Sequence, residues 1–127
     1  MTDQCCEKGK KRVLMYSCSG GANVAEISDK AARQLMLANE GTMFCLAGLG
    51  ADIEGIIQTA KDADVNLVID GCPTDCGKKI FERHGINNYV QIKVTDLGIE
   101  KAKGVSCSQK QVDKVLAKAR EILAEQE

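Results

Sequence analysis

The chain has 127 residues, of which 44% are hydrophobic and 3% aromatic, and its formal net charge is -1. This length is enough for one domain with a single core. The charge argues against nucleic acid as a partner, because there is no broad basic field and few rings on which bases could stack. No stretch approaches the roughly 18 apolar residues of a membrane span, and the N-terminus lacks the apolar run of a signal peptide. We therefore expect a cytoplasmic protein that binds neither nucleic acid nor membrane.

The N-terminal segment differs in charge from the rest of the chain. Residues 1–12 hold four basic and two acidic side chains, a net charge of +2. We interpret them as a solvated basic arm. Residues 13–127 are predicted to form a single α/β domain.

Four short apolar runs alternate with helical patterns along that domain. Repeated alternation of strand and helix predicts right-handed crossovers, and therefore a parallel sheet with helices on both faces. We predict a three-layer α/β sandwich whose mainly parallel four-stranded sheet has the flavodoxin-like order 2-1-3-4. This order places the first and third strands side by side. The predicted strands are residues 13–17, 42–48, 66–71 and 89–94.

Polar residues mark where the predicted helices begin. Two of them have the spacing of a capping box, with Glu26 and Gln111 as the reciprocal partners. The helix after the third strand is expected to end at Gly85. The expected N-caps, in chain order, are Asn23, Asp52, Thr74 or Asp75, and Ser108.

Four of the seven cysteines lie near the carboxyl ends of predicted strands. In a parallel sheet these ends meet at one edge, where the ligand sites of open α/β sheets form. Cys18 and Cys45 belong to the first two strand ends. Cys72 follows the third strand and Cys76 begins the next helix, with the chain's single proline, Pro73, stiffening the turn between them. We predict that the four thiols cluster at the carboxyl edge.

Such a cluster suits a soft metal ion. Four thiols satisfy the ligand count of a tetrahedral zinc site, and thiolates also suit an Fe–S cluster or another soft metal such as Cu(I). An odd number of cysteines in a reducing compartment favours metal or thiol chemistry over a disulfide framework. The competing interpretation is core filling, because free cysteine is among the most buried residue types.

Four segments resemble the DGC-domain family of zinc-binding proteins. They are the Asp-Gly-Cys triplet at residues 70–72, YSCSGGANV at 16–24, FCLAGLGADI at 44–53 and VTDLGI at 94–99. Members of this family are described by four potential metal-chelating cysteines. The motif match implies that these are Cys18, Cys45, Cys72 and Cys76, with a metal ion as the partner. The resemblance covers residue 13 to nearly the C-terminus and implies no particular reaction.

Two other functions stay open at this point, and with them the question of whether the protein is an enzyme. A thiol-dependent enzyme, redox or group-transfer, would use Cys76 or Cys18 as its nucleophile, since a helix N-terminus favours the thiolate. Alternatively, the Gly-rich loops would bind phosphate or a nucleotide. Against these, Val24 stands where a low-molecular-weight phosphatase needs arginine, and Ile53 stands where the dinucleotide motif needs glycine.

A few further residues have two possible roles. Asp70 lies at the end of the third strand and Asp96 follows the fourth, where each would either support a metal site or stabilise a turn. Cys5, Cys6 and Cys107 fall outside the matched family segments. The arm, or the loop at residues 96–104, would have to fold over the sheet edge to bring one of these thiols to the site.

Overall fold

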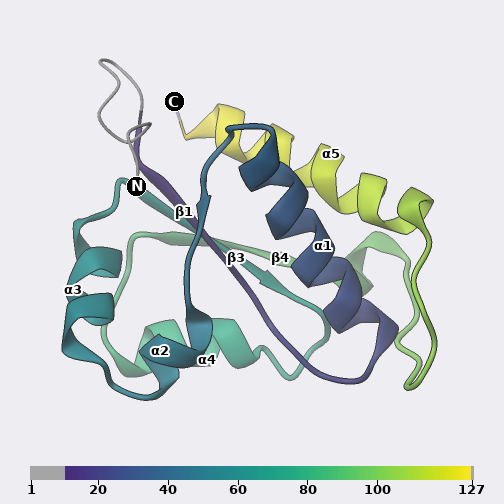
Figure 1. The fold of residues 1–127 in the computed structure, drawn as a ribbon, viewed down its shortest axis with the longest axis horizontal. Coiled ribbons are helices and arrows are strands. Elements are labelled where there is room, and N and C mark those ends of the chain that lie inside the picture. Colours follow the sequence, from purple (N-terminus) through teal and green to yellow (C-terminus); the bar gives the residue numbers. More distant parts are fainter. Residues whose placement is uncertain (1–10, 127) are drawn as a thin grey trace.

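Four parallel strands form one sheet in the order β2-β1-β3-β4 (Figure 1). The structure is a computed structural model that describes residues 11–126. β1 pairs with β2 and with β3, and β3 pairs with β4, in each case in parallel. The predicted α/β class and strand order are confirmed. The strands are β1 (Val13–Ser17), β2 (Thr42–Met43), β3 (Val65–Asp70) and β4 (Tyr89–Lys93).

Helices cover both faces of this sheet, as Figure 1 shows. One face packs against α1 (Asn23–Leu37) and α5 (Gln109–Glu125). The other face packs against the shorter helices. These are α2 (Leu46–Gly50), α3 (Glu54–Asp62) and α4 (Cys76–Arg83), and a 3-10 helix, η2 (Val94–Leu97), directly follows β4.

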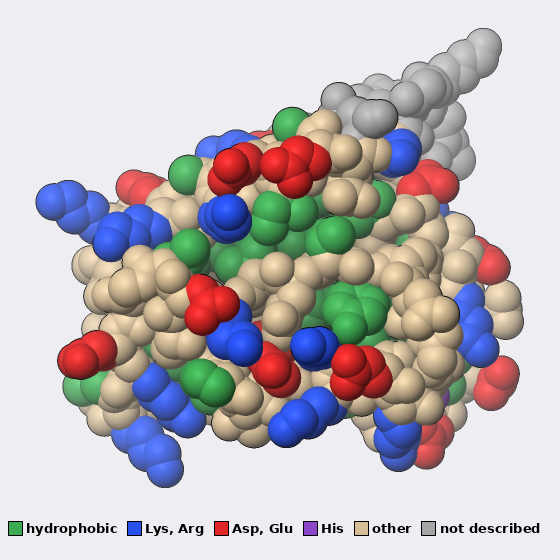
Figure 2. Space-filling model, turned by 180° about the vertical axis from the view of Figure 1, so that it is seen from behind, with side chains coloured by type: hydrophobic (Ala, Val, Ile, Leu, Met, Phe, Trp, Pro, Cys, Tyr) green, Lys and Arg blue, Asp and Glu red, His purple; other side chains and the backbone are tan. Residues whose placement is uncertain are grey.

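The central strands separate two hydrophobic clusters. Because successive side chains of a strand point to opposite faces, Met15 and Leu67 face α1 and α5, whereas Leu14, Tyr16 and Val68 face the shorter helices. All six residues of β3 are buried, which is typical of a parallel strand covered on both sides. On the outer surface, acidic and basic side chains are interspersed over the face shown in Figure 2, in agreement with the net charge of -1.

The predicted strand over residues 42–48 is wrong beyond Met43. Cys45 is instead the N-cap of α2, where its Sγ accepts a hydrogen bond from the Gly48 N–H at 3.2 Å. A short apolar run has no periodicity that distinguishes a strand from a buried turn of helix. Gly48 allows α2 to pack closely against α3, because a Cβ at this position would lie 2.2 Å from Ile56 Cδ1.

The predicted capping box at Ser108 and Gln111 is confirmed, with both reciprocal hydrogen bonds present. The box predicted at Asn23 and Glu26 is wrong. Ala22 is the N-cap of α1, and Asn23 is the first helical residue. Both polar side chains bond to distant parts of the chain instead: Glu26 Oε1 accepts from the Cys107 N–H at 2.9 Å.

The other two predicted caps have mixed outcomes. Asp75 is the N-cap of α4, but its side chain makes no cap hydrogen bond. Ile53 rather than Asp52 is the N-cap of α3, and Asp52 pairs with Arg83 instead. Gly85 follows α4 in the left-handed conformation, with φ of 68°, as expected for a helix stop.

Two of the predictions concern residues that the structure does not describe in full. Cys5, Cys6 and most of the predicted arm at residues 1–12 lie outside the described residues. Within residues 11–126, no helix is both long enough and apolar enough to cross a membrane.

Candidate functional site

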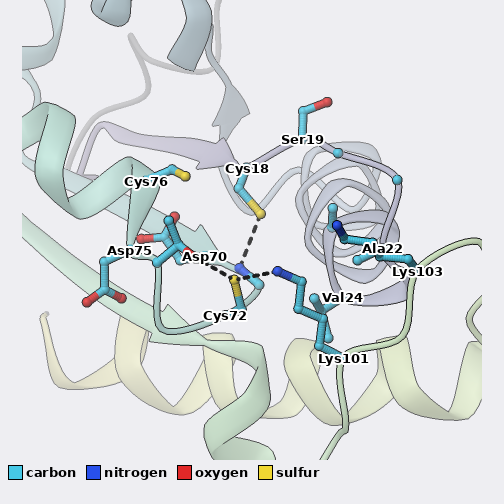
Figure 3. Close-up of a pocket in the computed structure, with 15 residues that line it drawn as sticks. Cys18, Ser19, Ala22, Val24, Asp70, Cys72, Asp75, Cys76, Lys101 and Lys103 are labelled. Carbon is cyan, nitrogen blue, oxygen red and sulfur yellow. Dashed lines mark hydrogen bonds between the residues drawn. The ribbon is translucent and has the colours of Figure 1, made fainter.

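A pocket of about 300 Å³ opens at the carboxyl ends of β1 and β3 (Figure 3). Its walls are the β1–α1 loop at residues 18–22, the β3–α4 loop at 71–75, and a segment that carries Lys101 and Lys103. The neighbouring position of β1 and β3 in the sheet brings the first two walls together. The site therefore lies at the edge where ligand sites of open α/β sheets form.

Three of the four predicted metal ligands line this pocket: Cys18, Cys72 and Cys76. Figure 3 shows their sulfur atoms directed into the space between the two loops. Cys45 is exposed at the start of α2 and does not line the pocket. Cys107 packs against the core on the α1 and α5 side. Among residues 11–126, no three His, Cys, Asp or Glu side chains are close enough together to hold a metal ion, so the four-cysteine ligand set stays a prediction.

Cys18 is held between the two central loops. Its Sγ accepts the Gly71 N–H at 3.1 Å and lies 3.7 Å from Ser28 Oγ. Burial raises the pKa of this thiol above its usual value, although the hydrogen bonds with Ser28 and Gly71 oppose the shift. Cys18 is therefore a protonated thiol at neutral pH in the absence of a metal.

Cys72 has the opposite environment. Its Sγ lies 3.4 Å from Thr74 Oγ1 and 3.5 Å from Lys101 Nζ. The hydrogen bonds from Thr74, and then the ammonium group of Lys101, lower the pKa of the Cys72 thiol. Cys72 therefore ionises at a lower pH than Cys18, whose pKa is raised.

Asp70, the first residue of the Asp-Gly-Cys triplet, stabilises the start of α4. It is 1% exposed. Its carboxylate accepts the Gly77 N–H at 2.8 Å, the Lys78 N–H at 3.1 Å and the Gln91 side-chain amide at 2.9 Å. These donors include amides of the first turn of α4, so Asp70 takes the role that a capping side chain would have. Asp70 thereby fixes the direction in which α4 presents Cys76.

Gly71, the second residue of the triplet, allows the β3–α4 loop to approach α1. A Cβ at this position would lie 2.9 Å from Val24 Cγ2 and 3.0 Å from the Val24 carbonyl carbon. The third residue, Cys72, then faces the pocket. The triplet thus combines a helix-stabilising carboxylate, a close backbone approach and a thiol in consecutive positions.

The third wall of the pocket is a strap, residues 100–104, that crosses the start of α1. The Asn23 N–H donates to the Ala102 carbonyl at 2.9 Å, and the Gly104 N–H donates to the Gly21 carbonyl at 2.9 Å. The Asn23 side chain accepts the Ala102 N–H at 2.7 Å and donates to the Glu100 carbonyl at 2.9 Å. These four bonds hold the strap, which positions Lys101 beside Cys72.

The sequence does not predict the strap, and it leaves open whether this loop brings Cys107 over the site. Residues 96–104 bring lysines to the pocket, while Cys107 does not line it. Asp96 lies in η2, is exposed, and does not line the pocket either. The charged loop at residues 100–104 has the composition of ordinary solvated surface, and only its contacts with Gly21 and Asn23 in the folded structure show where it lies.

These features define a parallel α/β domain with a thiol pocket at the carboxyl edge of its sheet. The model of the DGC domain matches residues 14–119, and the chain belongs to this family. The resemblance drawn from the sequence motifs is confirmed. A curated relative, "Anaerobic and virulence modulator AnvM" from Pseudomonas aeruginosa, is 29% identical over 110 residues, which are 87% of this chain and 84% of the relative. No solved structure matches the chain.

Proposed function

We propose that this protein is a cytoplasmic metal-binding module whose ion is zinc, held by Cys18, Cys72 and Cys76. The observation that carries the proposal is the position of three thiols, from the ends of two adjacent strands, on the walls of one pocket. Three thiolates match the donor preference of Zn²⁺. The loops that carry these thiols would have to draw them closer around the ion.

The charges around the pocket favour this proposal. Cys76 begins α4, so a negatively charged metal–thiolate group there would lie at the positive end of the helix dipole. Lys101 contacts Cys72 and offsets part of the negative charge that three thiolates would bring. The reducing cytoplasm would keep these cysteines free to bind metal. The P. aeruginosa relative is named as a modulator, and a regulatory module of this kind needs no reaction of its own.

A titration of the reduced, metal-free protein with Zn²⁺, or with Co²⁺ as a spectroscopic probe, tests the proposal. We expect about one ion per chain, and a strong loss of affinity on Cys18→Ser, Cys72→Ser or Cys76→Ser, because a neutral hydroxyl is a poor ligand for a soft metal. Cys107→Ser is the matched control and should bind normally. No uptake by the wild type, or equal damage by Cys107→Ser, would contradict the proposal.

The variant Cys45→Ser extends this experiment to the fourth predicted ligand. It was predicted as a ligand, yet it caps α2 outside the pocket. If Cys45 completes a closed tetrahedral site, Cys45→Ser will weaken binding as much as Cys72→Ser does. If the fourth position is open, Cys45→Ser will bind the metal normally and the site will have the coordination typical of catalytic zinc.

Thiol chemistry at Cys72 is the second candidate function, and the Lys101 contact favours it. The sequence suggested Cys76 or Cys18 as the nucleophile. Burial disfavours the Cys18 thiolate by raising its pKa, whereas Cys72 is half-buried and has a lowered pKa. A single fast-reacting thiol at neutral pH in wild-type protein that takes up no metal would make this candidate the better one.

A further inference from the structure

We propose that the pocket also binds a small organic anion, whose carboxylate or phosphate group is held by Lys101 and Lys103 beside the thiols. Such a ligand is distinct from the metal ion, because the strap and the charge distribution of the pocket would recognise it. The thiols alone suggest only an ion.

The strap gives these lysines a defined place. A lysine in a surface loop is usually not fixed in one position. Here, however, residues 100–104 are held to the start of α1 by four hydrogen bonds that involve Gly21 and Asn23. Asn23, which provides three of them, is buried, with 5% of its surface exposed. Lys103 forms an antiparallel bridge with Ala22, and Lys101 reaches Cys72. The chain therefore builds a cationic wall over the pocket.

The negative charges of the two pocket carboxylates, Asp70 and Asp75, are already balanced by hydrogen bonds and by an ion pair within the protein. Asp70 accepts two backbone N–H groups and the Gln91 amide. Asp75 lies 3.3 Å from Lys93 Nζ and accepts from Gln91 at 2.9 Å. Figure 3 shows Asp70 and Asp75 on the opposite side of Cys72 from Lys101. Their negative charge is thus directed away from the cationic wall.

The two lysines, in contrast, have no carboxylate partner within residues 11–126, and the contact that Lys101 makes is with Cys72 Sγ. Among the residues that the structure describes, neither Lys101 nor Lys103 has a carboxylate within the 4.0 Å limit of an ion pair. Two cationic side chains at the rim of a concave site raise the local concentration of anions. The charge of the pocket therefore selects a negatively charged ligand.

The volume limits the size of that ligand. About 300 Å³ is at the lower end of the range for ligand pockets, so a small carboxylate or phosphate fits better than a nucleotide. Gly20 and Gly21 are exposed in the pocket wall opposite the β3–α4 loop. A Cβ at Gly21 would meet nothing within 4 Å, which shows that the pocket is open there.

A comparison of two alkylating reagents on the reduced, metal-free protein tests the charge selection directly. Iodoacetate carries a carboxylate and iodoacetamide is its neutral analogue. In both reactions the Cys72 thiolate forms a C–S bond and displaces iodide, so the ratio of the two rates cancels the reactivity of the thiolate itself. We expect this ratio to fall roughly fivefold in the double variant Lys101→Gln/Lys103→Gln, which removes two positive charges close to the reacting sulfur.

Lys114→Gln is the matched control. It removes one positive charge from an exposed position on α5, outside the pocket, and should leave the ratio unchanged. An unchanged ratio in the double variant, or an equal fall in Lys114→Gln, would refute the cationic wall. Circular dichroism of each variant checks that the fold is retained.

A protection experiment then distinguishes the ligand classes. Inorganic phosphate in one series, and succinate in the other, is titrated against the rate of Cys72 alkylation by iodoacetamide. We expect at least one of them to slow the reaction in the wild type and neither to do so in the double variant. Protection by neither anion, or equal protection in the double variant, would overturn the proposal. Because zinc is absent throughout, normal zinc uptake alongside a negative result here would refute the anion site alone.

Discussion

Cys18 and Cys72 lie in the same pocket but in opposite electrostatic environments. Cys18 is held against Gly71 and Ser28, where burial raises its pKa. Cys72 is stabilised as a thiolate by Thr74 and Lys101, which lower its pKa. Because the thiolate is the nucleophile and the metal ligand, the two residues become reactive over different pH ranges.

The pH dependence of alkylation should show this difference. The thiolate fraction rises as pH passes through the pKa, so in metal-free protein Cys72 should reach half of its maximal rate at a lower pH than Cys18. The measurement is the iodoacetamide rate at each cysteine as a function of pH, followed by mass spectrometry of peptides. Lys101→Gln should move the Cys72 midpoint to higher pH. Coincident profiles for the two thiols in the wild type would contradict this assignment.

The hydrogen bonds of Asp70 lead to a second prediction, which concerns the stability of the variant Asp70→Asn. In Asp70→Asn, the side-chain amide would place an N–H₂ group near the Gly77 and Lys78 N–H donors, and at least one buried amide would lose its acceptor. We expect a loss of about 1–3 kcal/mol in the free energy of unfolding, measured with urea. Asp96→Asn is the control, since Asp96 is exposed in η2, beyond the end of β4, and should change stability by less than about 0.5 kcal/mol.

The secondary-structure elements show which features local sequence determines. The Ser108–Gln111 box depends on residues three apart, and it was predicted correctly. The role of Asn23 depends on the Ala102 amide, 79 residues away, so local spacing suggested a cap that does not form. β2 is short for a different, local reason: Cys45 caps α2 through the Gly48 N–H, within the run that looks like a strand. Contacts distant in sequence therefore explain why the N-cap of α1 was predicted wrongly and why the strap at residues 100–104 was not predicted.

A glycine substitution tests how closely α1 approaches the β3–α4 loop. In Gly71→Ala the new Cβ would lie 2.9 Å from Val24 Cγ2, and α1 would have to shift. We expect a loss of about 1–3 kcal/mol in urea unfolding, the usual cost of overpacking. Gly55→Ala in α3 is the matched control: nothing lies within 4 Å of that Cβ, so stability should rise by up to about 1 kcal/mol. Destabilisation of both variants alike would contradict the packing argument.

At the level of the whole molecule, the strand order could be predicted because right-handed crossovers with helices on both faces of the sheet require the winding to reverse, as it does in the order 2-1-3-4. That order places β1 beside β3, and it accounts for the shared pocket of Cys18 and Cys72. Cys45 lies outside the pocket because the chain leaves β2 at Met43. The strap and its lysines have no signal in the order of strands, so they could be found only from the folded structure.

The two hydrophobic clusters determine what metal removal would do to the fold. One is built around Met15, Leu67 and Ile69 under α1 and α5, and the other around Leu14 and Tyr16 under the shorter helices. Neither includes Cys76, and Cys72 only packs at the margin of the first. The core is therefore complete without an ion, unlike that of a zinc finger, whose folding depends on the metal.

Chelation of the zinc-loaded protein should accordingly leave the far-ultraviolet circular dichroism nearly unchanged. Stability should fall by mass action, by about 2.7 kcal/mol if free zinc was a hundredfold above its dissociation constant. Hydrogen exchange should increase in the loops at residues 18–22 and 71–75, which carry the ligands, while amides of β1 and β3 stay protected. The Cys18→Ser/Cys72→Ser double variant controls for direct effects of the chelator, which should not change its exchange. A complete loss of circular dichroism on chelation would show instead that the ion is required for folding, because no hydrophobic cluster would then hold the sheet together without it.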